Sequence, residues 1–304
     1  MNLLTELQKY LEYCEYRKEL SHNTLKAYRI DLRQYISFIG GDFLQKPRIE
    51  EYITKLHKEF KQKTVKRKIA SVKAFYRYLE EEEILKEANP FDRIRVKFKE
   101  VESLPRIIPR EDIEKLLNYM YTARGDRGAE ERLCRDILII ELFFATGIRV
   151  YELSNLKKED IDIKNGIVRI MGKGGKERYV QIGNEDVLKL MEEYSGYQKE
   201  HKEGDAFFFT NLHRKRYTEQ SIRLMIKKYS NLAGTTVRIT PHLFRHSMAT
   251  YLLEEGVDVM FIQKILGHSS VRTTQIYLHI ASNVQMEILK RRHPRNKMNI
   301  GRAA

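Results

Sequence analysis

The chain has 304 residues, of which 42% are hydrophobic and only 6 are proline, and this composition favours a globular protein of two domains over a disordered chain. Its 56 Lys and Arg residues outnumber its 42 Asp and Glu residues, and the resulting net charge of +14 is typical of proteins that bind polyanions. Two distant cysteines, Cys14 and Cys134, and no long apolar N-terminal stretch argue against a secreted or membrane protein and predict a cytoplasmic one.

The positive charge is spread along the chain. The first 100 residues hold 22 basic and 16 acidic side chains, a net charge of +6, and the remainder carries +8. A duplex held by both parts fits this distribution better than a basic tail on a neutral enzyme. A solvated, highly charged surface is the alternative.

Residues 1–90 predict a helical domain. Ser21 or Asn23 is expected to cap the second helix, and a later helix is expected to begin after Thr64. Apolar residues recur at helical spacing in three runs: Leu4, Leu7, Leu11 and Cys14; Leu25, Tyr28, Leu32, Tyr35 and Ile36; and Val65, Ile69, Val72, Phe75 and Leu79.

A linker is predicted over residues 91–109, because Asn89 and Pro90 stop the helical pattern and the segment lacks periodicity. The second domain, 110–304, is expected to hold helices over 110–121 and 133–146, then a hairpin around the Gly-rich turn MGKGGKERY. Residues 207–209 are expected to add a third short strand, and the chain beyond residue 219 to be helical. This predicts a mainly α fold with a small β-sheet in the C-terminal domain.

The segment TPHLFRHSM predicts an anion site at a helix N-terminus. Thr240 is expected to cap a helix whose first turn contains Pro241, which places His242 and Arg245 on one face. Unpaired backbone N–H groups and the helix dipole favour a phosphate there. Zinc binding by His242 and His246 is a weaker alternative, because further ligands are missing and Arg245 would repel a cation.

Three other segments hold candidate residues that are ordinary when taken singly. Arg149 follows the end of an apolar helix at Gly147, and Lys173 lies in the hairpin turn, which lacks the Ser or Thr and the helix of a nucleotide-binding loop. His268 follows Gly267, and Tyr277 comes nine residues later. Taken alone, Arg149 would be interpreted as a surface arginine and Tyr277 as a packed or surface tyrosine.

Taken together and in order, these residues resemble the tyrosine recombinase family, also called the phage integrase family, and most closely its Xer-type members. The motifs ATGIRVYEL, HLFRH, LGHSS and TTQIY carry the resemblance, which covers nearly the whole chain. It implies an N-terminal helical, SAM-like core-binding domain and a catalytic domain that close around DNA as a two-domain clamp. It also implies a tail helix from about residue 282.

The resemblance further implies a reaction and its residues. Tyr277 would attack the scissile phosphate to form a 3′-phosphotyrosyl link, with Arg149 and Arg245 stabilising the phosphorane. Lys173 would act as general acid, His242 would accept the tyrosine proton, and His268 would bind the phosphate. No cofactor, ATP or metal is expected.

The implied partners are double-stranded DNA half-sites and further protomers, in a tetramer on two duplexes that proceeds through a Holliday junction. A paralogous recombinase or accessory protein is a further possible partner. Chromosome-dimer resolution and mobile-element integration or excision both remain open. Weaker alternatives are a relaxase resembling type IB topoisomerases, a non-catalytic DNA-binding regulator and an RNA-binding protein.

Overall fold

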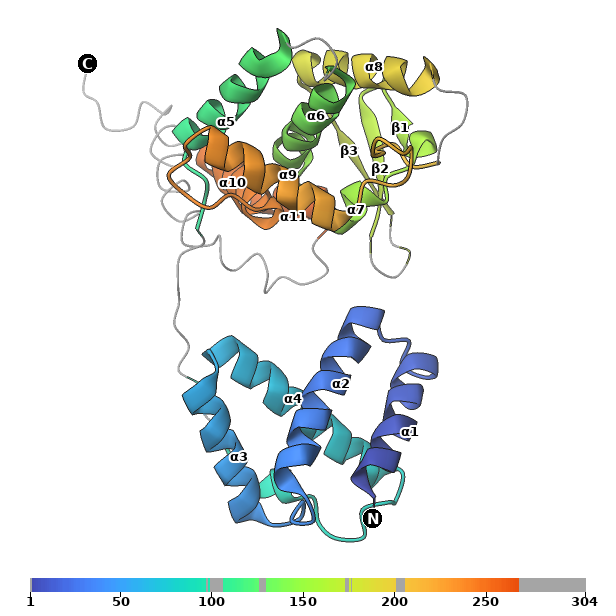
Figure 1. Ribbon diagram of the computed structural model, residues 1–304, viewed down its shortest axis with the longest axis vertical. Coiled ribbons are helices and arrows are strands. Elements are labelled where there is room, and N and C mark those ends of the chain that lie inside the picture. The colour runs from blue at the N-terminus through green and yellow to red at the C-terminus, as the bar shows by residue number, and fades with distance from the viewer. Residues whose placement is uncertain are drawn as a thin grey trace, which may run out of the picture. The chain divides into compact units, whose positions relative to one another are not determined.

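Figure 1 shows the computed structural model of the chain, which describes residues 2–96, 98, 106–125, 130–172, 175, 177–200 and 206–267. The chain divides into two compact units, Met1–Glu102 and Ser103–Ala304, each with its own hydrophobic core. Lys173, His268, Tyr277 and the tail helix expected from about residue 282 lie outside the described residues. Within the described part, no helix is long and apolar enough to cross a membrane.

The N-terminal unit is helical, as predicted. Ser21 caps α2 by accepting a hydrogen bond from the Thr24 N–H, which selects it over Asn23. Leu4 is exposed although it was assigned to the apolar face, because Leu3 and Leu7 form the buried side of α1. The helices are α1 (Leu3–Tyr16), α2 (His22–Ile39), α3 (Lys46–Glu59) and α4 (Gln62–Glu81), followed by the short 3₁₀ helix η1 (Pro90–Arg93).

Helix α4 begins earlier than predicted, at Gln62 rather than after Thr64. The backbone of Lys61 takes the extended capping conformation, and its carbonyl oxygen accepts hydrogen bonds from the N–H groups of Thr64 and Val65. A cap made by the backbone alone leaves no residue-type signal, whereas Thr64 resembled a side-chain cap.

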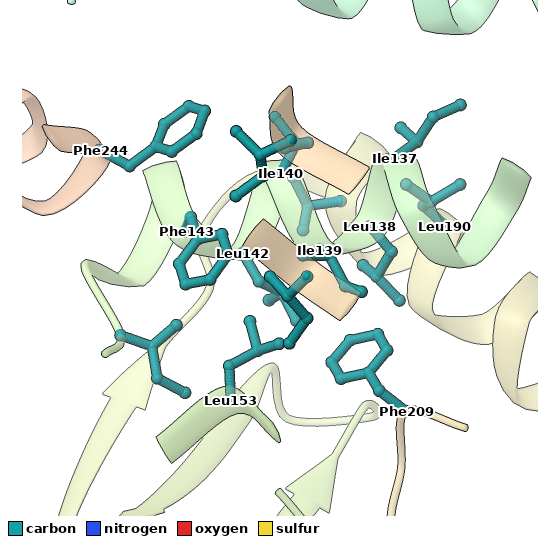
Figure 2. Packing of buried hydrophobic residues seen from close by; sticks show 14 of the residues in the cluster. Ile137, Leu138, Ile139, Ile140, Leu142, Phe143, Leu153, Leu190, Phe209 and Phe244 are labelled. Carbon is teal, nitrogen blue, oxygen red and sulfur yellow. The ribbon is translucent and has the colours of Figure 1, made fainter. Parts of the chain in front are cut away.

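The C-terminal unit is built around α6, and its mainly helical character with one small sheet agrees with the prediction. Buried side chains point to every side of α6, which identifies it as the central helix of the core (Figure 2). The rings of Phe143 on α6 and Phe244 on α10 stack with centroids 6.0 Å apart. The elements are α5 (Arg110–Thr122), η2 (Ala123–Gly125), α6 (Glu130–Thr146), α7 (Val150–Ser154), η3 (Lys158–Asp160), β1 (Ile161–Asp162), β2 (Ile167–Met171), β3 (Glu177–Gln181), α8 (Glu185–Glu200), α9 (Glu219–Leu232), α10 (Pro241–Glu254) and α11 (Val259–Leu266).

The small sheet is antiparallel, with strand order β1-β2-β3 and the predicted hairpin formed by β2 and β3. The prediction of a third strand over 207–209 was wrong, because β1 fills that position and Phe207 makes only an isolated bridge with Lys157. Phe208 and Phe209 are both buried, and their rings pack against Tyr194 of α8. Two consecutive buried side chains break the alternation that a strand with one wet face requires.

Candidate active site

The N-terminus of α10 has the predicted form. The Thr240 side chain accepts a hydrogen bond from the Leu243 N–H, and Pro241 occupies the first turn. His242 and Arg245 are three positions apart in the helix, so both lie on the side of α10 that faces one pocket. His242 is exposed, whereas Arg245 is only 3% exposed. One helix end therefore presents an imidazole at the surface and a guanidinium beneath it.

Arg245 is held in place by backbone carbonyl groups from two other elements. Its Nη1 donates to the carbonyl oxygen of Gly147 at 2.6 Å, and its Nη2 donates to that of Leu266 at 2.5 Å. Gly147 has a positive φ, and a Cβ there would lie 2.6 Å from Cδ2 of Leu266, so only glycine fits this close approach. The ends of α6 and α11 thus fix the orientation of the Arg245 fork.

Arg149 is the N-cap residue of α7, directly after the turn that follows α6. Its backbone N–H donates to Oε2 of Glu152 at 2.9 Å, and its Nη1 donates to Oε1 of the same carboxylate at 2.8 Å. The Arg149 side chain stays 43% exposed, whereas the Glu152 carboxylate is buried. Glu152 therefore orients an arginine that remains accessible to a ligand.

Sequence reasoning missed both Glu152 and its second partner, Arg178 of β3. The Arg178 Nη1 and Nη2 atoms donate to the two oxygens of Glu152 at 2.9 and 2.7 Å. Burial by itself would raise the pKa of the Glu152 carboxyl, but the hydrogen bonds from Arg178 and Arg149 outweigh burial and lower that pKa below its ordinary value. The three-residue spacing from Arg149 is the only sequence signal for Glu152, and the hairpin turn gave none for Arg178.

Arg149, His242 and Arg245 line one pocket of about 650 Å³. The structure thus brings together the three predicted site residues that it describes. The described residues that line this pocket include five cationic side chains and no carboxylate, an arrangement that suits a polyanion. The other lining residues come from the turn before α7, from α7, from α9 and from the segment that leads into the first residue of α10: Ile148, Val150, Tyr151, Gln220, Arg223, Leu224, Lys227, Arg238, Ile239, Thr240 and Pro241.

His246 lies one turn beyond His242, and the two rings meet edge to face with centroids 4.5 Å apart. Burial, and then the charges of His242 and Arg245, lower the pKa of His246 to about 4. Across the part of the chain that the structure describes, no three His, Cys, Asp or Glu side chains are grouped as metal ligands would be. The described residues therefore offer this histidine pair no further ligand for zinc.

The lowered pKa of His246 predicts a loss of stability in mild acid. Between the ordinary value of 6.5 and about 4, the unfolded chain binds a proton that the folded chain excludes, so the free energy of unfolding falls as the pH falls. The slope from this group is at most about 1.4 kcal/mol per pH unit. His246→Gln should flatten the slope in urea unfolding measured between pH 7 and 5. An unchanged slope would contradict the prediction.

Comparison with known proteins gives consistent matches over nearly the full length. A profile of the phage integrase family matches residues 106–283, and a profile of the phage integrase N-terminal SAM-like domain matches residues 7–83. A tyrosine recombinase of Agathobacter rectalis is 44% identical over 97% of this chain and 98% of its own length. Tyrosine recombinase XerC of Oceanobacillus iheyensis is 33% identical over 96% of this chain and 97% of its own.

Solved structures show the same architecture. The crystal structure of XerA recombinase is 28% identical and covers 95% of this chain and 99% of its own, with a TM-score of 0.53. XerH site-specific recombinase bound to its palindromic difH substrate is 22% identical and covers 92% of this chain and 82% of its own, with a TM-score of 0.74. The second likeness concerns the fold alone.

Proposed function

The chain belongs to the phage integrase family and is a tyrosine recombinase, a site-specific enzyme of DNA recombination, and from this we propose a mechanism for its own residues. The Tyr277 oxygen attacks the scissile phosphorus, a P–O bond forms, and the bond from phosphorus to the 5′-oxygen breaks. The products are a 3′-phosphotyrosyl link and a free 5′-hydroxyl. Attack by the 5′-hydroxyl of another strand reverses the step, so no ATP is consumed.

The pocket that holds Arg149 and Arg245 is the observation that carries this proposal. The phosphorane bears more negative charge than the starting phosphodiester, and preoriented guanidinium groups stabilise that increase. Arg245 is buried and fixed by two carbonyl groups, and Arg149 is fixed by Glu152. Both arginines thus already have their orientation before DNA arrives.

Three further residues complete the proposed chemistry. Lys173 protonates the leaving 5′-oxygen, and His242 accepts the tyrosine proton. His268 donates a hydrogen bond to the phosphate. The role of His242 is supported by its position in the same pocket as both arginines. The roles of Lys173, His268 and Tyr277 rest on the family motifs.

We propose that residues 1–90 form a core-binding domain and residues 110–304 a catalytic domain, that a linker over 91–109 joins them, and that the two domains enclose double-stranded DNA. The active assembly is a tetramer on two half-site pairs, because exchange between two duplexes needs four cleavages. The tail segment from about residue 282 joins neighbouring protomers. The resemblance to Xer-type members implies a role in resolving chromosome dimers, alone or with a paralogous recombinase or accessory protein, and relatives named XerC and XerD are each 33% identical to this chain.

A two-site recombination assay tests this function. Sites are first selected from a random DNA pool, and two copies are then placed on one plasmid. Recombined circles are the expected product. A relaxase would change only the supercoiling, and a non-catalytic regulator would bind the sites without cutting them, so either result would refute the proposal. A natural site at the end of a mobile element would favour the integrase alternative.

A further inference from the structure

Arg178 on β3 makes a set of contacts that the mechanism above does not use. Its side chain is only 11% exposed, although arginine is normally a surface residue. Besides its two bonds to Glu152, its Nε donates to the carbonyl oxygen of Ile265 at 2.9 Å. All three nitrogen atoms of the guanidinium group therefore donate to an acceptor on another element, and these hydrogen bonds fix the position of the group.

The C-terminal end of α11 packs closely against the Arg178 side chain. Gly267 caps α11 in the left-handed conformation, and a Cβ at this residue would lie 2.9 Å from Cδ of Arg178. The neighbouring Leu266 carbonyl oxygen accepts from Arg245, so adjacent carbonyl groups of one helix end anchor two different arginines. Arg178 thus lies beside the pocket arginines without lining the pocket itself.

The charge arrangement gives Arg178 a consequence for Arg149. Glu152 lies between the two guanidinium groups and is shared by them. If Glu152 had Arg149 as its single cationic partner, its negative charge would offset the positive charge that Arg149 presents to a phosphate. With Arg178 on its other side, the three side chains carry a net charge of +1, and the accessible member is Arg149.

We propose that Arg178 is a positioning residue for strand cleavage, which acts on the scissile phosphate through Glu152 and Arg149. It holds the carboxylate that orients Arg149 and balances that carboxylate's charge. This inference rests on the proposed function of the pocket. The β2–β3 hairpin would then contribute to cleavage in two ways, through Arg178 on its second strand and through Lys173 in its turn.

The test compares Arg178→Met with wild type in single-turnover cleavage of a nicked substrate by saturating protein. The rate of covalent complex formation should fall about a hundredfold, the scale expected when a catalytic group is displaced by about 1 Å. The DNA Kd should change little by comparison, whereas the Tm should fall, because the buried Glu152 carboxylate loses one of its two cationic partners. Arg169→Met is the matched control, since Arg169 of β2 also pairs with a buried carboxylate, Asp160, and should leave cleavage unchanged.

A double-mutant cycle separates action through Arg149 from a general structural defect. Adding Arg178→Met to Arg149→Ala should lower the rate little further, because the residue through which Arg178 acts is already absent. Arg178→Lys keeps the charge but loses the fork, so its rate should fall between those of wild type and Arg178→Met. If the methionine variant does not fold, the same cycle is run with Arg178→Lys.

A folded Arg178 variant with the wild-type rate would overturn the proposal, and so would a full additional loss in the Arg149→Ala background. Failure of the proposed function itself looks different. In that case wild-type protein gives no covalent complex at all, and no variant can be compared with it.

Discussion

Tyr277→Phe should bind the recombination site with wild-type affinity and form no covalent protein–DNA complex. The substitution removes one hydroxyl, which is the proposed nucleophile, and leaves the ring and the cationic pocket unchanged. Phosphate contacts supply most of the affinity for DNA, so binding should persist. A nicked substrate traps the cleaved strand on the protein, and a denaturing gel then separates linked from free DNA.

Tyr151→Phe is the matched control, because Tyr151 lines the pocket beside Arg149 and is 59% exposed. It is the tyrosine nearest in sequence to a pocket arginine, and it should retain the covalent product. Covalent DNA on the Tyr277 variant, together with its loss from the Tyr151 variant, would reassign the nucleophile. Loss of binding by Tyr277→Phe would show that this residue contributes to more than the chemical step.

Arg149→Ala should lower the cleavage rate about a hundredfold to a thousandfold. Removing one preoriented donor from a transition state costs about 2.7 to 4 kcal/mol in the barrier. Arg149 qualifies as such a donor because Glu152 accepts hydrogen bonds from both its backbone and its side chain. The measurement is the single-turnover rate at saturating protein, where changes in affinity no longer contribute.

Lys227→Ala provides the contrast, since Lys227 of α9 lines the same pocket. As a phosphate contact it should weaken binding and reduce the salt dependence of the Kd by about one counterion, with little effect on the saturated rate. If both substitutions changed the rate and the affinity equally, this would contradict the assignment of Arg149 to the chemical step and of Lys227 to DNA binding. An Arg149→Ala variant with a near wild-type rate would remove this residue from the mechanism.

The caps and faces of single helices followed from local sequence. Thr240, Pro241, His242 and Arg245 lie within one and a half helical turns, so backbone geometry alone sets their relative positions. The same reasoning gave Ser21 as one of two candidate caps of α2, and it predicted a helix over 133–146 where α6 runs from Glu130 to Thr146. It failed where a cap is made by the backbone, as at Lys61, and where consecutive aromatic rings are buried, as at Phe208 and Phe209.

The sequence by itself determined which residue types the site contains, because each motif is a short stretch whose spacing and capping act locally. Only the tertiary structure decided how they are held. Arg245 is fixed by carbonyl groups 98 and 21 residues away, and Glu152 by an arginine 26 residues away. Every residue type has a backbone carbonyl group, so no sequence pattern marks these acceptors. The pair between Glu152 of α7 and Arg178 of β3 joins two different elements, so no helical or strand periodicity predicts it. Such contacts arise only when α6, α7, α10, α11 and β3 pack together.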